Sequence, residues 1–236
     1  MAKEAEKIIV ALDVADLKSA KKLLTELDGV ITYYKIGFEL FTAYGWKAVE
    51  LVRKFGGKVF LDLKLHDIPN TVSKTAAVIC EHEIDMFNVH ALGGLEMMKK
   101  TVETVQEKCV KAKKKPLLIG VTILTSHSES NLSAELGITR GLEEEVLSLA
   151  GLAKRAGLNG VVCSPQEIRS LRKSLGKNFV IVTPGIRPAG GAKDDQKRIF
   201  TPQDALRAGA DYLVIGRPIN AAAHPRAAAK TILESL

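Results

Sequence analysis

Residues Lys58–Lys64 read KVFLDLK, a short run in which three apolar residues after Lys58 are followed by the charged Asp62 and Lys64. Its apolar residues stand next to one another, which is typical of a parallel strand buried on both faces. Seven similar runs occur along the chain: Ile8–Asp13, Tyr33–Phe38, Met86–Ala91, Pro116–Leu124, Gly160–Ser164, Phe179–Ile186 and Asp211–Gly216. Most runs are followed by a helical pattern, at about 30 residues per unit, which predicts an α/β protein with a (β/α)8 barrel of the TIM type. A doubly wound open sheet is the alternative.

The segments between these runs have the spacing of amphipathic helices. One buried helix face is predicted by residues that step by three or four: Leu95, Met98, Val102, Val105 and Cys109. Several candidate helices end in glycine, which readily adopts the left-handed backbone conformation common at a helix C-terminus. These glycines are Gly29, Gly56, Gly157, Gly176 and Gly209. Neither a linker nor a shift in composition divides the chain. We therefore expect a single barrel domain over residues 1–236.

The composition excludes several classes of protein. The chain has 236 residues, 46% hydrophobic and 26% charged, which excludes a disordered or fibrous chain. Its longest nearly unbroken apolar stretch, Pro116–Leu124, is far shorter than the ~20 residues that cross a bilayer. The acidic N-terminal segment has no secretory signal pattern, and the three cysteines form no CxxC pair. We expect a cytoplasmic protein without a membrane partner.

The net charge of +7 raises the possibility of nucleic-acid binding. However, the densest basic run, Lys111–Lys115, follows a helical pattern, and cations are favourable at a helix C-terminus. No aromatic residues interleave with these lysines to stack on bases. We expect no nucleic-acid partner and read the positive charge as an attraction for a small anionic substrate.

Charged residues gather where the first three predicted strands end. The first run ends in Asp13, the second carries Lys35, and the third continues through Asp62, Lys64 and Asp67. The carboxyl ends of barrel strands form the active site in this architecture. Buried charges are tolerated there when each has a neighbour of opposite charge. We therefore predict a set of alternating charges formed by Lys35, Asp62, Lys64 and Asp67. An ordinary surface ion pair is the alternative.

The last two predicted strands end in sequences suited to an anion. Gly185 and Arg187 follow the seventh run, and Gly216 and Arg217 follow the eighth. Phosphate commonly binds at these two loops of a barrel. Glycine has no side chain, so its backbone N–H group can approach the anion closely, and arginine adds charged hydrogen bonds. Plain turns and solvated arginines are the alternative.

No sequence motif predicts a cofactor. The chain has no GxxxxGK[ST], GxGxxG or HExxH pattern, so we predict neither a bound nucleotide cofactor nor a metal. His90 stands at a predicted strand end, where we expect it to make a core or loop hydrogen bond.

Three motifs make the chain similar to the orotidine 5′-phosphate decarboxylase family in its bacterial-type form. They are DLKLHDIPNTV (Asp62–Val72), VTPGIRP (Val182–Pro188) and DDQKR (Asp194–Arg198), and the resemblance runs from ALDV at Ala11 to IGRPI at Ile215. It implies a homodimer that converts orotidine 5′-phosphate to uridine 5′-phosphate (UMP) and CO₂ without a cofactor. This reaction is the last step of de novo pyrimidine synthesis.

The resemblance also implies a role for each matching residue. Lys64 resembles the catalytic lysine, which stabilises and protonates a carbanion at C6 of the pyrimidine. Lys35, Asp62 and Asp67 resemble the rest of the charged array, with Asp67 supplied to the site of the other subunit. The remaining substrate contacts implied are Asp13 and Lys35 at the ribose, Thr71 from the partner's loop, Thr125, and Arg187, Gln196, Gly216 and Arg217 at the phosphate end.

Two other functions remain as alternatives. A magnesium-dependent 3-keto-L-gulonate 6-phosphate decarboxylase shares the Asp-x-Lys-x-x-Asp pattern, but it needs an acidic metal ligand where this chain has Lys35. A non-catalytic RNA-binding protein would bind nucleic acid with an affinity that falls steeply with salt.

Overall fold

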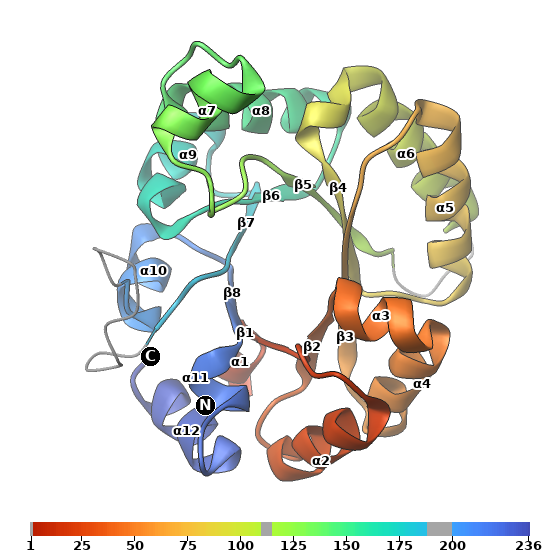
Figure 1. Ribbon diagram of the computed structural model, residues 1–236, viewed down its shortest axis with the longest axis vertical. Coiled ribbons are helices and arrows are strands. Elements are labelled where there is room, and N and C mark those ends of the chain that lie inside the picture. The colour runs from red at the N-terminus through yellow and green to blue at the C-terminus, as the bar shows by residue number, and fades with distance from the viewer. Residues whose placement is uncertain (1, 110–114, 188–199) are drawn as a thin grey trace. The chain divides into compact units, whose positions relative to one another are not determined.

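Eight parallel strands alternate with helices and form a closed barrel in the order β1-β2-β3-β4-β5-β6-β7-β8 (Figure 1). This is a computed structural model, and it describes residues 2–109, 115–187 and 200–236. The strands are β1 (Ile8–Ala11), β2 (Tyr33–Ile36), β3 (Lys58–Leu65), β4 (Met86–His90), β5 (Leu117–Val121), β6 (Gly160–Val162), β7 (Val180–Thr183) and β8 (Tyr212–Ile215). Seven lie within their predicted apolar runs and β3 extends one residue beyond its run, to Leu65; the closed order confirms the (β/α)8 barrel over the open sheet.

Helices follow the strands along the chain. They are α1 (Ala2–Ala5), α2 (Leu17–Leu27), α3 (Phe38–Tyr44), α4 (Trp46–Lys54), α5 (Pro69–Glu81), α6 (Gly94–Lys108), α7 (Glu129–Leu136), α8 (Leu142–Ala156), α9 (Ile168–Leu175), α10 (Pro202–Ala208), α11 (Arg217–Asn220) and α12 (Pro225–Glu234). Short 3₁₀ turns cover Ala91–Gly93 and Pro165–Glu167. Gly157 ends α8 with a φ of 90°, and Gly209 ends α10 with a φ of 115°, so the predicted glycine stops are confirmed there.

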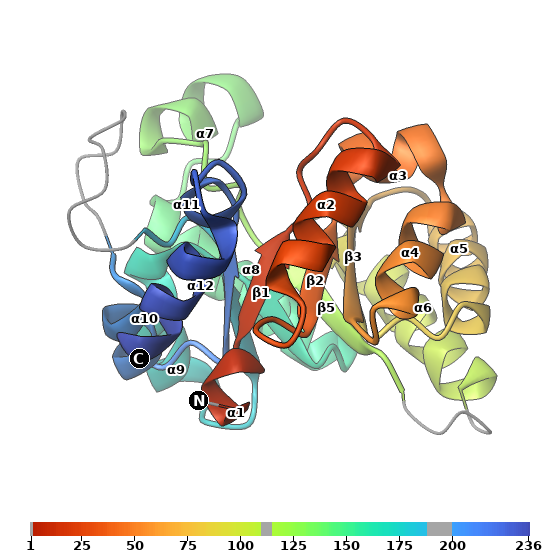
Figure 2. The ribbon, with the colours of Figure 1, turned by 90° about the horizontal axis from the view of Figure 1, so that it is seen from below.

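The chain divides into two compact units, Met1–Leu63 with Thr183–Leu236, and Lys64–Val182. In the first unit β1 pairs with β2 and with β8, and β2 pairs with β3. The helix α2 packs between α4 and α12 on the outside of these strands (Figure 2). This pairing places the carboxyl ends of β1, β2 and β3 side by side.

In the second unit β4, β5, β6 and β7 pair in that order. The helices α5 and α6 lie side by side against one another (Figure 1). Gly160 of β6 stands opposite Val180 of β7, and a Cβ at Gly160 would collide with the carbonyl oxygen of Val180. The close approach of β6 to β7 at this point therefore requires glycine.

The buried face of α6 differs from the predicted one. Its buried residues are Met97, Met98, Thr101 and Val105, followed by Cys109. Leu95 and Val102, which we expected on that face, are only half-buried. Thr101 is fully buried because its hydroxyl donates to the Met97 carbonyl at 2.7 Å, so the polar group costs little there.

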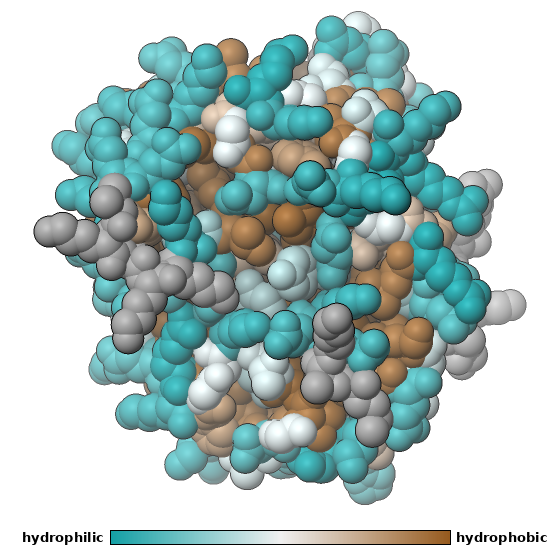
Figure 3. All heavy atoms as spheres, turned by 180° about the vertical axis from the view of Figure 1, so that it is seen from behind, coloured by the Kyte–Doolittle hydropathy of each residue, from teal (hydrophilic) through white to brown (hydrophobic). Residues whose placement is uncertain are grey.

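The face seen in Figure 3 is mainly hydrophilic, with hydrophobic side chains visible between the polar ones. Five large apolar side chains of the described residues are exposed: Phe38, Ile68, Val78, Leu92 and Leu136. None of the helices in the described part of the chain is both long enough and apolar enough to cross a membrane. The expectation that residues 1–236 behave as one domain stays a prediction.

Candidate active site

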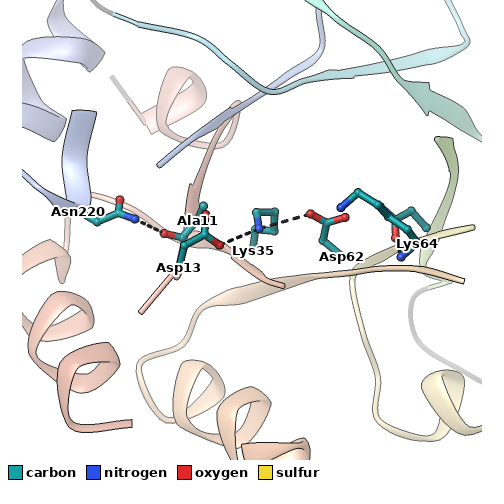
Figure 4. A network of polar contacts seen from close by, with 7 residues as sticks. Ala11, Asp13, Lys35, Asp62, Lys64 and Asn220 are labelled. Atoms are coloured by element: carbon teal, nitrogen blue, oxygen red, sulfur yellow. Dashed lines mark hydrogen bonds and ion pairs between the residues drawn. The ribbon is translucent and has the colours of Figure 1, made fainter. Parts of the chain in front are cut away.

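The side chains of Asp13, Lys35 and Asp62 form a charged network at the ends of β1, β2 and β3 (Figure 4). The Lys35 ammonium donates to Asp13 Oδ1 at 3.0 Å and lies 3.4 Å from Asp62 Oδ2. Lys35 is on β2, Asp62 is on β3, and Asp13 follows β1 by two residues. The strand pairing thus brings together three of the residues expected at the site.

The network combines buried and accessible charges. The side chains of Lys35 and Asp62 are only 11% and 12% exposed, whereas that of Asp13 is 54% exposed. Burying an ammonium and a carboxylate is costly unless they are paired, and here one ammonium contacts two carboxylates. The network therefore holds Asp62 in a fixed place and leaves Asp13 accessible to a ligand.

Gly37 makes room for this network. A Cβ at this position would lie 3.0 Å from Lys35 Nζ and 3.6 Å from Asp13 Oδ1. We did not select Gly37 from the sequence, although its place two residues after Lys35 could have suggested a close approach.

The corner between β8 and α11 lies next to Asp13. Gly216 precedes α11, and a Cβ there would lie 3.7 Å from Asp13 Oδ2. The Asn220 side chain, which we also did not select from the sequence, donates to the Ala11 carbonyl at 2.9 Å and so ties α11 to the end of β1 (Figure 4). Gly216 is thus beside the network.

The arginines selected for a phosphate site are both described. Arg217 is exposed and is the first residue of α11. Arg187 is half-buried, and its backbone N–H donates to the Phe200 carbonyl at 3.3 Å. Gln196 lies outside the described residues.

Lys64 lies in the second unit, one residue before the end of β3, where its backbone is unusual. Its φ is 43°, in the left-handed region that residues with a side chain rarely adopt. Its backbone N–H donates to Asn88 Oδ1 at 2.7 Å. Asn88 is on β4 and is 1% exposed. The sequence contains a signal for Asn88 that we did not use, namely an amide inside an apolar strand.

Two histidines stack in the same unit as Lys64. The rings of His66 and His90 have their centroids 5.5 Å apart at an interplanar angle of 25°. His90 Nδ1 accepts from the backbone N–H of Leu92 at 3.4 Å, which confirms the expected loop hydrogen bond. Burial, with the nearby charges of His66, Lys64 and His127, lowers the pKa of His90 to about 4. His90 is therefore neutral near pH 7.

Asp67, Thr71 and Thr125 are exposed residues that follow β3 and β5. The Asp67 carboxylate accepts from the backbone N–H of Ile68 at 2.6 Å, just before α5 begins. Thr71 is in the first turn of α5, and Thr125 follows β5 by four residues. The contact shown for Asp67 is local, so its expected place in an alternating charge set stays a prediction.

Comparison with known proteins identifies the family. Residues 6–232 match the family model described as "Orotidine 5′-phosphate decarboxylase / HUMPS family". The chain belongs to this family. Among curated members, the orotidine 5′-phosphate decarboxylase of Moorella thermoacetica is 51% identical over 228 residues, which cover 96% of this chain and 90% of that protein. The orotidine 5′-phosphate decarboxylase of Idiomarina loihiensis is 50% identical over 230 residues, which cover 98% of this chain and 97% of that protein.

A solved structure of the same family has the same fold. The crystal structure of orotidine 5′-phosphate decarboxylase from Lactobacillus acidophilus matches with a TM-score of 0.85 at 39% identity. The match covers 96% of this chain and 97% of that one. The resemblance to the decarboxylase family expected from the sequence motifs is confirmed.

Proposed function

We propose that this chain is a carboxy-lyase that converts orotidine 5′-phosphate to UMP and CO₂, the last step of de novo pyrimidine synthesis. The observation that carries the proposal is the Asp13–Lys35–Asp62 network at the ends of β1, β2 and β3, with Lys64 two residues beyond Asp62 on β3. The relatives that cover nearly the whole chain bear the same function in their names.

The chemistry explains why an ammonium is needed. When the bond from C6 to the carboxylate breaks, its electron pair stays on C6 in an orbital that the ring cannot delocalise. A nearby positive charge stabilises that pair, and Lys64 supplies both the charge and the proton that takes the place of CO₂. The neutral Lys64 amine then regains a proton from solvent.

The buried carboxylate and its partner prepare the site for this step. Asp62 next to the departing carboxylate destabilises the substrate more than the transition state. Lys35 holds Asp62 from 3.4 Å, so the carboxylate needs no rearrangement when substrate binds. Asp13 and Lys35 hold the ribose hydroxyls, for which the exposure of Asp13 leaves access.

The phosphate end of the substrate supplies binding energy far from C6. Arg217, Gln196 and the backbone N–H of Gly216 hold the phosphate, and Arg187 and Thr125 add contacts to the substrate. The place of Gly216 beside Asp13 supports this assignment, because it puts the phosphate end next to the ribose end. Interactions at the phosphate raise the rate when they hold the reacting part in place.

A homodimer with shared active sites completes the proposal. Asp67 and Thr71 serve the site of the partner subunit. Ile68, which stands between them in the sequence and is 67% exposed, would be covered by the partner in this arrangement. We place the dimer in the cytoplasm, with a small anionic substrate rather than nucleic acid as its partner.

One assay tests the proposal against its alternatives. The absorbance change of orotidine 5′-phosphate is followed with and without exhaustive EDTA treatment, and 3-keto-L-gulonate 6-phosphate with Mg²⁺ is assayed in parallel. We expect decarboxylation of the nucleotide at an unchanged rate in EDTA, because the Lys35 ammonium occupies the position between the two carboxylates where a metal cation would bind. Activity restored only by Mg²⁺, or seen only with the gulonate, would reject the proposal.

A further inference from the structure

The backbone of Lys64 is held in a conformation that needs an explanation. Among the described residues other than glycine, only Lys64 and Glu83 have a positive φ. Glu83 follows the end of α5, where its N–H donates to the Cys80 carbonyl, and such turns commonly contain a left-handed residue. Lys64 instead lies within a strand, where such a conformation is strained and persists only when the surrounding structure enforces it.

Asn88 supplies the contact that enforces it. Its side-chain oxygen accepts from the Lys64 N–H at 2.7 Å, a short and well-formed hydrogen bond. Asn88 is 1% exposed and stands between Phe87 and Val89, which are fully buried. A buried amide among apolar residues is unfavourable without such partners. The two unusual features, a strained lysine and a buried asparagine, therefore meet in one hydrogen bond.

The backbone that carries Asn88 is fixed by strand pairing. Asn88 stands opposite Ile119 in the register of β4 with β5, at the centre of five paired positions. An acceptor mounted on the middle of a paired strand is more precisely placed than one on a loop. The direction in which the Lys64 side chain leaves the backbone depends on its φ, so the position of the ammonium depends on this acceptor.

We propose that Asn88 is a positioning residue, which holds the Lys64 backbone in the conformation that presents the ammonium to the substrate. This inference rests on the proposed role of Lys64 in protonating C6. Asn88 does not touch the reacting atoms in this assignment. Its effect on the rate comes through Lys64 alone.

The chain offers a control with the same type of bond at Asn159, which is exposed whereas Asn88 is buried. The Asn159 side-chain oxygen accepts from the backbone N–H of Leu118, at 2.8 Å, in the same unit. That bond lies at the start of β5, far along the chain from Lys64, and joins residues with no assigned role in the reaction. Asn159→Ala removes the same type of hydrogen bond without affecting Lys64.

The test compares Asn88→Ala, Asn88→Asp and Asn159→Ala by kcat, by affinity for UMP and by thermal midpoint. We expect Asn88→Ala to lower kcat by about 10- to 100-fold, since a misplacement of about 1 Å can cost that much. Its UMP affinity should stay near that of the wild type. Asn88→Asp, which keeps an acceptor oxygen, should retain most of the kcat, and Asn159→Ala all of it.

A second step asks whether Asn88 acts through Lys64. The variants Lys64→Ala and Lys64→Ala with Asn88→Ala are compared in single turnovers with excess enzyme. We expect equal residual rates, because a positioning residue has no effect once its target is absent. A further loss of ten-fold or more in the double variant would overturn the inference.

The outcomes separate this inference from the proposed function. A Lys64→Ala variant with wild-type kcat would reject the role of Lys64 itself. An inactive Lys64→Ala variant together with an Asn88→Ala variant as active as Asn159→Ala would reject only the role of Asn88. An Asn88→Ala chain that does not fold, or whose kcat and UMP affinity fall in proportion, would assign Asn88 to the fold and overturn the inference as well.

Discussion

At the scale of single residues, the placement of one ammonium between two carboxylates is the feature on which the site depends. Lys35 contacts Asp13 and Asp62 at 3.0 and 3.4 Å, and Gly37 lies close enough that a Cβ there would reach the ammonium. We therefore expect the site to depend both on the charges and on the absence of a side chain at Gly37.

Gly37→Ala tests the importance of that space. The added Cβ would lie 3.0 Å from Lys35 Nζ, so the flexible end of the lysine must shift and its contacts with the two carboxylates must change. We expect kcat/KM to fall by about tenfold, equivalent to ~1.4 kcal/mol of transition-state stabilisation. The free energy of unfolding should change by less than about 1 kcal/mol, since only a side-chain end shifts.

Gly151→Ala is the control for this substitution. A Cβ at Gly151 of α8 would have no neighbouring atom within 4 Å. We expect unchanged kcat/KM and about 0.5–1 kcal/mol of added stability, because alanine favours a helix interior. Equal kcat/KM for the two variants would show that Lys35 tolerates displacement.

Individual residues were predicted from the sequence only in part. The charge types and positions of Asp13, Lys35 and Asp62 were visible because charged residues at the ends of apolar runs stand out. Gly37, Asn88 and Asn220 were missed: the amide of Asn88 within an apolar strand and the glycine two residues after Lys35 were signals that we did not use, and Asn220 follows no pattern in the sequence. Their importance depends on contacts between strands that are far apart in sequence.

At the scale of elements, the strands were better predicted than the faces of the helices. Each apolar run contains one strand, because a strand buried on both faces must be apolar throughout. The buried face of α6 was predicted in part: Met98, Val105 and Cys109 are buried as expected, but Thr101 was missed, because it satisfies its hydroxyl within the helix and so can enter the core. Local hydrogen bonding thus determines whether a polar residue of a helix can be buried, which hydropathy alone does not predict.

The end of β4 gives a prediction on pH. The pKa of His90 is lowered to about 4 in the folded chain, whereas an unfolded histidine titrates near 6.5. Between these values the unfolded chain binds a proton that the folded chain does not, so the free energy of unfolding falls as the pH is lowered from about 6.5 to about 4. We expect His90 to account for about 1–2 kcal/mol of this loss, after allowance for its partial exposure to solvent.

Urea unfolding at pH 7 and at pH 5 measures this effect. His90→Gln should lose less stability between the two pH values than the wild type. His224→Gln, at an exposed histidine before α12, shows whether removal of any histidine has the same result. The same loss in the wild type and in His90→Gln would contradict the prediction.

The corner between β8 and α11 gives a prediction on ligand binding. Arg217 is exposed at the start of α11, where we assign it to the phosphate. Arg217→Ala should weaken binding of UMP by about 10- to 100-fold, as expected for a charged hydrogen bond of about 1.5–3 kcal/mol. Binding of uridine should hardly change. Calorimetry with both ligands measures the two losses, and losses of equal size would remove Arg217 from the phosphate site.

At the scale of the whole molecule, the proposed dimer makes each active site depend on two chains. Lys64 of one chain would work with Asp67 of the other. Asp67 is exposed and follows β3, and Ile68 beside it is 67% exposed. If the two-fold axis of the dimer passes near this segment, the same residues of both chains lie in the interface.

Subunit exchange between two inactive variants tests this arrangement. In a mixed dimer of Lys64→Ala and Asp67→Ala, one site carries both changes and the other carries neither. Equal mixing makes about half the dimers mixed, so activity should recover to about a quarter of the wild-type value. Mass spectrometry of differently tagged chains confirms the exchange. Exchange without recovery would place Asp67 in the site of its own chain.

The contact between Gly160 and Val180 has a consequence for any attempt to evolve this enzyme. Every side chain at position 160 would begin with a Cβ that collides with the backbone of β7, and a backbone oxygen cannot move aside as a side chain can. In a library that contains all twenty amino acids at this position, selection for folded protein alone should return glycine. Position 160 should therefore accept no substitution even under selection for a different substrate.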